Sequence, residues 1–372
     1  MRVLAGIAGL AILLIVLRDA FETIILPRRV SRMFRLTSLF YRASWRPWRG
    51  IATRLSGGFR ENSLSWFGPL SLLLLLALWA FSIVLAFGIL QWAAGSALKM
   101  DGNAPHFLDD LYLSGTTFFT LGMGDVVPRI PLAKVLTTLE AGLGFAFLAI
   151  IIGYLPVIYQ AFSRREIAIS LLDARAGSPP SAGELLWRYR DDETQRDLVR
   201  LLTEWERWAA EVLESHLSYP VLAYFRSQHS NQSWLAALTT ILDTSALVIV
   251  GFDGWCMRQA QLTFAMARHA AVDLAQVFSA RAQVRAKDRL DPESFARLVE
   301  RLHSAGMEFR EEDAGPRLAE LRAMYEPYVT ALSHHLALPL PAWMHDGKAV
   351  DNWQAAPWKT GRTGTPGTEE HF

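Results

Sequence analysis

Three apolar segments of this chain are long enough to cross a lipid bilayer, and they constrain its fold more than any other feature. The clearest is Leu64–Trp92, which contains the run LSLLLLLALWAFSIVLAFGIL. Another is Pro131–Phe162, which is interrupted by Lys134 and Glu140. Since about 20 apolar residues span the hydrocarbon core, we expect a transmembrane helix in each of these two segments.

The first apolar segment, Val3–Leu17, is shorter. It extends to Leu26 if Arg18 and Asp19 lie near the membrane interface. A cleaved signal peptide is the competing interpretation. The residues RDAFET disfavour it, because they follow the apolar run where small residues would be expected. We therefore expect an N-terminal transmembrane helix within residues 1–26.

The loop between the two longer segments contains the peptide TTFFTLGMGD, from Thr116 to Asp125. This peptide resembles the selectivity filter of potassium channels. With its flanking segments it resembles the pore-loop domain of the potassium channel superfamily, in which two membrane helices surround a re-entrant loop. The resemblance covers residues 65–162, and TLGMGD is its specific part. The position between two membrane spans disfavours the alternative of a simple glycine-rich turn.

The resemblance implies that identical loops around a symmetry axis replace the water of a cation with rings of backbone carbonyls. Gly122 and Gly124 suit this role, because glycine adopts the left-handed backbone that points successive carbonyls the same way. Thr120 adds a hydroxyl at the inner end, and the Asp125 carboxylate raises the local cation concentration at the outer end. Phe107–Phe119 is expected to form a short helix whose carbonyl end points toward the cation. The implied ion-binding residues are Thr120, Leu121, Gly122, Met123, Gly124 and Asp125.

Two positions depart from the family pattern. The family usually has an aromatic residue between the two glycines, where this chain has Met123, so selectivity for potassium over sodium stays open. The family often also has an acidic residue on the pore helix that bonds toward the filter aspartate. Thr116 occupies that place here, so Asp125 is expected to lack this support.

Charge asymmetry predicts the orientation of the membrane segments. Residues 28–60 carry repeated arginines and no acidic residue, which marks them as cytoplasmic, whereas the loop 95–130 is acidic and should face outward. The expected topology in the cell membrane is an outside N-terminus, a basic inner loop, an outer pore loop and a cytoplasmic C-terminal region. The stretch Arg28–Arg60 is expected to lie on anionic lipid headgroups.

Arg29, Arg32 and Arg35 recur at every third position, as in a voltage-sensing helix. Trp45 and Pro47 lie within the same arginine-rich stretch, which favours an amphipathic segment on the membrane surface. Nothing in the sequence supplies the four-helix domain that voltage sensing requires.

The third apolar segment should line the inner pore. Gly144 falls where many family members carry a hinge glycine, and Pro156 removes one backbone hydrogen bond farther along. Opening by bending at Gly144 or by splaying at Gly153–Pro156, and simple close packing of helices at the glycines, all stay open. Glu140 either attracts cations at the cavity or, as we prefer, bonds to hydroxyls such as those of Thr116 or Thr117 behind the filter. The pore and gating candidates are Thr116, Glu140, Gly144, Gly153 and Pro156.

Beyond Ser163 the chain changes to charged residues and leucines at helical spacing, which predicts an all-helical soluble domain. Ser181 with Glu184 reads as a capping box. Asp291 as N-cap and Pro292 begin a helix that Gly306 can end. A further apolar stretch, Ser233–Gly251, contains Asp243 and is interpreted as a buried helix in preference to a fourth span. One helix face is expected to be buried, with Leu198, Leu201, Leu202, Trp205, Trp208, Ala209 and Val212.

Composition and motifs exclude several other functions. A net charge of +1 gives no case for nucleic-acid binding, and Cys256, the only cysteine, cannot form an intrachain disulfide. The sequence has no HExxH, no paired CxxC and no glycine-rich phosphate loop. We expect no enzyme, no metal site and no cofactor other than the permeant cation, K+ or another monovalent ion. The regulatory ligand is unknown.

The sequence thus predicts an all-α membrane protein that forms a homotetrameric cation channel, most readily for potassium. A weakly selective channel, or a non-conducting membrane-anchored sensor or scaffold that acts through its helical domain, are the alternatives. The expected parts are an N-terminal helix (1–26), a basic linker (27–63), a pore domain (64–162), a cytoplasmic helical domain (163–344) and a flexible tail (345–372). Within the pore domain we expect an outer helix (64–92), a pore helix (107–119), a filter (120–125) and an inner helix (131–162).

Overall fold

Helices make up nearly all of the ordered structure, which confirms the expected all-α membrane protein. In the part of the chain that the computed structural model describes, the only strands are two short ones that pair with each other. The described residues are 1–26, 36–99, 105–190, 192–229, 231–252, 254–283, 288–310 and 312–345. Arg29, Arg32, Arg35 and nearly all of the tail predicted at 345–372 lie outside them.

The chain divides into two units, each with its own core. Unit 1 consists of residues 1–164 and 214–226, and unit 2 of residues 165–213 and 227–372. The first boundary lies close to the change of composition at Ser163. The return of residues 214–226 to unit 1 was not expected, because the sequence predicts one uninterrupted helical domain after Ser163.

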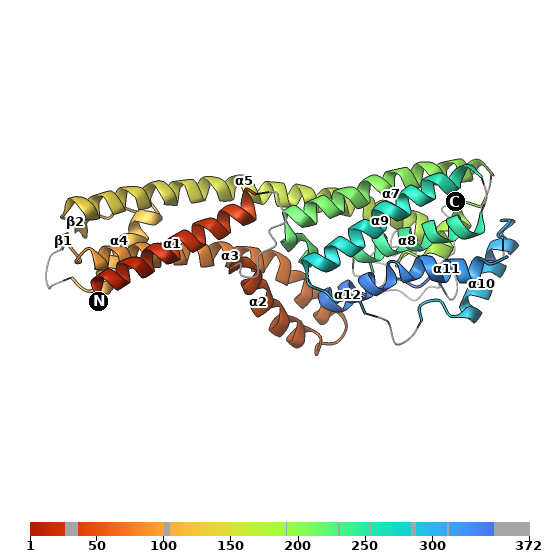
Figure 1. The fold of residues 1–372 in the computed structure, drawn as a ribbon, viewed down its shortest axis with the longest axis horizontal. Coiled ribbons are helices and arrows are strands. Elements are labelled where there is room, and N and C mark those ends of the chain that lie inside the picture. Colours follow the sequence, from red (N-terminus) through yellow and green to blue (C-terminus); the bar gives the residue numbers. More distant parts are fainter. Residues whose placement is uncertain are drawn as a thin grey trace, which may run out of the picture. The chain divides into compact units, whose positions relative to one another are not determined.

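Unit 1 is built on three long helices and two shorter ones (Figure 1). The long helices α1, α3 and α5 are each apolar enough to cross a membrane. Figure 1 shows α1 running along α3, and Gly9 permits this approach, because an added Cβ would lie 3.0 Å from the Ala86 carbonyl oxygen. The helices are α1 (Arg2–Ile24), α2 (Leu36–Ala52), α3 (Gly57–Ala93), α4 (Phe107–Phe118) and α5 (Pro131–Ala176, whose end lies in unit 2).

Two of these helices are longer than the sequence predicted. The helix α3 begins at Gly57 instead of Leu64, after Ser56 in extended backbone at the N-cap position. The helix α5 continues past Phe162 to Ala176, because residues 163–176 keep helical spacing and the backbone turns left-handed only at Gly177, with φ +78°.

Asp19 joins the first three helices of unit 1. Its carboxylate is buried and accepts hydrogen bonds from the backbone nitrogen and the hydroxyl of Thr37, on α2, and from the indole nitrogen of Trp79, on α3, at 3.0 Å. A buried carboxylate is costly unless it is hydrogen-bonded, and these three bonds satisfy Asp19 inside the protein.

Unit 2 packs around α8, in which every residue except Ile249 is buried. Although α8 is long and apolar enough to cross a membrane, its complete enclosure within the protein favours the interpretation of a buried helix. The expected face of α7 is also buried, from Leu198 to Val212. The helices of unit 2 are α6 (Ala182–Arg188), α7 (Asp192–Ser218, whose end lies in unit 1), α8 (Trp234–Gly251), α9 (Trp255–Val277), α10 (Pro292–Ser304), α11 (Ala314–Ala323) and α12 (Glu326–Leu336).

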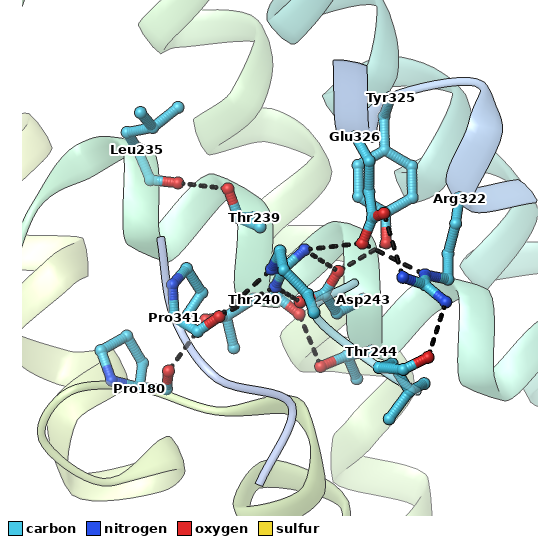
Figure 2. A network of polar contacts seen from close by, with 12 residues as sticks. Pro180, Leu235, Thr239, Thr240, Asp243, Thr244, Arg322, Tyr325, Glu326 and Pro341 are labelled. Carbon is cyan, nitrogen blue, oxygen red and sulfur yellow. Dashed lines mark hydrogen bonds and ion pairs between the residues drawn. The ribbon is translucent and has the colours of Figure 1, made fainter. Parts of the chain in front are cut away.

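Asp243, near the middle of α8, lies in a buried polar network (Figure 2). Its carboxylate forms an ion pair with Arg289, and the Tyr325 hydroxyl donates to it at 2.5 Å. Burial lowers the pKa of Arg289, but Asp243, Tyr325 and Glu326 together outweigh this effect, and the pKa lies above its usual value. The charge that argued against a membrane span is thus paired inside unit 2.

The predicted helix starts of unit 2 are present, with one difference. The Asp291 carboxylate accepts from the Ser294 nitrogen at 2.9 Å, and the backbone of Gly306 is left-handed just after α10 ends. The Ser181 hydroxyl accepts from the Glu184 nitrogen at 3.3 Å, as expected. The reciprocal half of that capping box is replaced, because the Glu184 carboxylate pairs with Arg188 and Arg301.

Candidate functional site

The loop that follows α4 begins with a tight return of the backbone. The Thr116 carbonyl accepts hydrogen bonds from the backbone nitrogens of Leu121, at 2.7 Å, and Gly122, at 3.3 Å. These bonds hold the first residues of the loop against the C-terminal end of α4, where helix carbonyls carry a partial negative charge. The candidate site therefore starts where the negative end of the expected pore helix is anchored.

The backbone of the loop alternates in handedness. It is left-handed at Thr120 (φ +58°), Gly122 (φ +54°) and Gly124 (φ +79°), whereas Leu121 and Met123 are not. Within the described residues, no hydrogen bond reaches the carbonyl oxygens of 120–124. Five successive carbonyls are therefore available to bind a cation.

The end of the loop at Asp125 is held by two contacts. The strands β1 (Leu98–Lys99) and β2 (Val127–Pro128) pair antiparallel, with Leu98 opposite Pro128. The side chain of Val126 is buried against Leu98 and Leu113. Both contacts fix the chain immediately after Asp125, which is exposed. This ribbon was not expected, because each strand has only two residues and shows no period-two pattern.

Tyr112, on α4, is the pore-helix residue whose side chain comes near Asp125. The Tyr112 hydroxyl lies close to the Asp125 carboxylate. The Thr116 hydroxyl donates instead to the Leu113 carbonyl, at 3.0 Å. The expectation that Asp125 lacks the usual acidic support at position 116 stays a prediction, and the nearby pore-helix hydroxyl is that of Tyr112, one turn earlier. A tyrosine one turn before Thr116 was the available signal.

Glu140 lies behind the loop and is fully buried. Its carboxyl group forms a short hydrogen bond with the Ser114 hydroxyl, on α4, which also lies 2.7 Å from the Val84 carbonyl oxygen, on α3. The partner of Glu140 is therefore the Ser114 hydroxyl, and not that of Thr116 or Thr117, which were the expected examples. One residue from each of three helices meets at this point, so the geometry favours the structural interpretation of Glu140 over the cavity-facing one.

The number of donor hydrogens available between Ser114, Val84 and Glu140 favours a protonated Glu140 side chain. A serine hydroxyl has one hydrogen to donate, and both the Val84 carbonyl and a carboxylate only accept. A protonated Glu140 resolves this, because it donates to Ser114, which in turn donates to Val84.

A glutamine at this position can donate in the same way. We therefore expect Glu140→Gln to keep the assembled protein within about 1 kcal/mol of wild-type stability, and Glu140→Ala to lose about 1–3 kcal/mol, as for a buried polar group left without its partner. Thermal unfolding in detergent checks both variants. Equal losses in the two variants would contradict this arrangement.

The glycines of α5 differ in their surroundings. An added Cβ at Gly144 would lie 2.1 Å from the Phe118 carbonyl oxygen, so α5 and the end of α4 touch at this point. Gly142 and Gly153 have no described atom within 4 Å of such a Cβ. This contact favours close packing over bending at Gly144, whereas splaying at Gly153–Pro156 stays a hypothesis, with Pro156 inside the helix.

Not all of the expected site residues come together. Three of them surround the start of the loop. The Thr116 carbonyl binds the loop backbone, Glu140 bonds to Ser114 on α4, and Gly144 lies against the end of α4. Gly153 lies about 14 Å beyond Gly144 along α5, at 1.5 Å per residue. Gly153 and Pro156 therefore belong to a separate part of the inner helix.

Comparison with known proteins places this site within a recognised domain. Residues 72–160 match a family described as "Ion channel", and this stretch includes most of α3, all of α4 and the loop. A protein of Bacillus subtilis (strain 168), named "Uncharacterized membrane protein YdjJ", is 25% identical over 198 residues. That similarity covers 52% of this chain and 56% of the Bacillus protein, so it spans little more than half of either. No solved structure matches the chain.

Proposed function

We propose that this membrane protein, whose residues 72–160 form an ion-channel pore-loop domain of the potassium channel superfamily, assembles as a homotetrameric cation channel. Cations would pass between the carbonyl oxygens of residues 120–124. The observation that carries the proposal is the alternating backbone of this loop, with five carbonyls that no described residue satisfies. Thr120 and Asp125 would form the inner and outer ends of the filter.

Assembly is required because one chain supplies only one side of a carbonyl ring. In the single chain the apolar residues Leu121 and Met123 are 64% and 67% exposed. Neighbouring copies would cover these side chains when four loops meet around an axis. The number four follows from the resemblance to the potassium channel superfamily.

We assign the basic face of α2 to the cytoplasmic membrane surface. Arg42 and Arg46 are exposed on this helix together with Leu39 and Ile51, whereas Trp45 is buried against α3. Mixed arginine and apolar residues suit a helix that lies in anionic headgroups. Unit 2 would then lie in the cytoplasm, because it follows an inner helix that starts on the outer side.

Ion flux tests the proposal. The purified full-length chain is reconstituted into vesicles with a potassium gradient, and flux is read with an ion-sensitive dye. We expect flux above that of empty vesicles. The size of unit 2, which lies wholly outside residues 72–160, favours a non-conducting sensor or scaffold as the second candidate. A scaffold would leave the gradient intact.

Met123 is expected to limit the selectivity of the channel. An aromatic ring at this position would brace the loop, and the exposed Met123 side chain leaves room for one within its own chain. We expect Met123→Tyr to raise the permeability of potassium relative to sodium by about tenfold, which corresponds to about 1.4 kcal/mol. Reversal potentials in mixed potassium and sodium solutions measure this ratio. An unchanged or lower ratio would show that the missing ring does not limit selectivity.

A further inference from the structure

Residues 214–226, called the return segment here, leave unit 2 at the end of α7, join unit 1, and lead back to unit 2 before α8. They contain the 3-10 helix η1 (Pro220–Tyr224). We propose that the return segment is the mechanical link through which unit 2 sets the position of the second half of α5 and so controls opening of the pore. This inference rests on the proposed channel function and adds a mechanism of regulation to it.

The return segment packs against the second half of α5. Leu222 and Phe225 are buried in one cluster with Tyr154 and Ile158, of which Ile158 is fully enclosed. The rings of Phe225 and Phe162 lie 5.7 Å apart. These α5 residues begin just after Gly153 and lie on both sides of Pro156. The segment therefore packs against α5 where the helix has open space beside Gly153 and carries Pro156 in its interior.

The return segment also packs closely against α3. An added Cβ at Gly68 would lie 2.8 Å from Cδ2 of Phe225 and 2.9 Å from the Tyr224 carbonyl oxygen. Leu72, one turn farther along α3, belongs to the same apolar cluster. A glycine at 68 is thus what allows the backbone of the return segment to lie directly on α3.

Aromatic rings and an ion pair hold the other side of the segment. The ring of Tyr224 stacks on that of Tyr41, on α2, with centroids 5.5 Å apart and planes 4° from parallel. The Trp45 ring lies 5.0 Å from the same tyrosine. Next to them, Nη1 of Arg226 lies 2.8 Å from Oε2 of Glu61, at the start of α3. The segment therefore binds α2, α3 and α5 at once.

These contacts imply coupling in both directions. If α5 bends or splays near Pro156 when the pore opens, Tyr154 and Ile158 move relative to α3, and the return segment must follow or release one of them. Because both ends of the segment continue into unit 2, any change in unit 2 that pulls on α7 or α8 acts on the same contacts. A coupling free energy between the two units is then expected, since each state of α5 favours a different placement of the segment.

Two sets of variants of the full-length protein test the link. Gly68→Ala pushes the segment away from α3, and its matched control is Gly58→Ala on the same helix, where a Cβ meets no described atom within 4 Å. The second set is Glu61→Arg, Arg226→Glu and the double charge swap, which keeps the ion pair with its charges exchanged. Single-channel recording measures open probability and unit conductance for each.

We expect Gly68→Ala, Glu61→Arg and Arg226→Glu to change open probability by about fivefold or more, as is typical of allosteric coupling, with unit conductance unchanged because the filter is not touched. Gly58→Ala and the double swap should stay near the wild-type open probability. A role confined to stability would lower the yield of folded channels without this pattern. Folded variants that all open as the wild type does would overturn the link.

Hydrogen exchange separates this inference from the proposed function. If the wild-type chain carries no ions, the channel proposal fails and control of opening fails with it. Faster exchange at α5 residues 154–162 in Gly68→Ala, but not in Gly58→Ala, would still support the grip of the segment on α5. Unchanged exchange in both variants would contradict the packing of the return segment against α5 as well.

Discussion

Replacing Gly122 with valine is expected to abolish cation conduction while the protein remains folded and tetrameric. Gly122 has φ +54°, a region that β-branched residues very rarely adopt. The valine would turn the peptide out of the left-handed conformation, and the carbonyls beside it would no longer point with the others. Because each ring takes one carbonyl from every copy, the defect occurs four times around the pore. Vesicle flux of the purified variant measures the loss.

Gly57→Val is the matched control for this prediction. Gly57 has nearly the same backbone, φ +56°, and like Gly122 it has no described atom within 4 Å of an added Cβ. It lies at the start of α3, away from the loop. Equal loss of flux in both variants would mean that backbone strain alone destabilises the protein. Normal flux in Gly122→Val would remove the loop from the ion pathway.

Replacing Gly144 with alanine is expected to break the contact between α4 and α5. The added Cβ would lie 2.1 Å from the Phe118 carbonyl oxygen, and a backbone atom cannot rotate away. Overpacking of this kind costs typically about 1–3 kcal/mol, and four copies would bear it. We expect a large fall in the fraction of tetramer that survives extraction in detergent, measured by size-exclusion chromatography and thermal unfolding.

Gly142→Ala, two residues earlier on α5, serves as its control. Its Cβ meets no described atom of its own chain, and alanine is favoured over glycine within a helix by about 1 kcal/mol. We expect this variant to be at least as stable as the wild type. If Gly144→Ala were also stable but opened less often, the hinge interpretation of Gly144 would replace the packing one.

The membrane part of the fold was predictable because its signals are local. The apolar runs at Leu64–Trp92 and Pro131–Phe162 fall within α3 and α5. The peptide TLGMGD falls on a loop whose backbone alternates as two spaced glycines suggest. Asp291 accepts a hydrogen bond at the start of α10, as its N-cap signature predicts. Each of these features depends on residues a few positions apart.

Features that join distant parts of the chain were missed. The return segment packs on α3 and α5 through apolar residues such as Leu222 and Phe225, which read in sequence as an ordinary stretch after α7. The β1–β2 ribbon links residues on both sides of the pore loop with too few residues for a period-two pattern. Contacts between residues far apart in the sequence determine the return segment and the ribbon, and no local sequence pattern predicts such contacts.

The candidate site was predicted better than its supports. The loop residues 120–125 are consecutive in the sequence, so they necessarily lie close together in the structure. Two supporting residues were not singled out: Ser114, which bonds to Glu140, and Tyr112, whose hydroxyl lies near Asp125. Both hydroxyls lie on α4. Glu140 is distant from α4 in the sequence and Asp125 follows a tight turn, so only the folded structure determines which hydroxyl comes near each carboxyl group.

A cryo-electron-microscopy structure of the purified protein in potassium tests the central claim most directly. We expect four copies of residues 120–124 around one axis, with their carbonyl oxygens turned inward and density for ions between successive rings. Loops that lie apart from any shared axis, or that turn their carbonyls away from it, would contradict the claim.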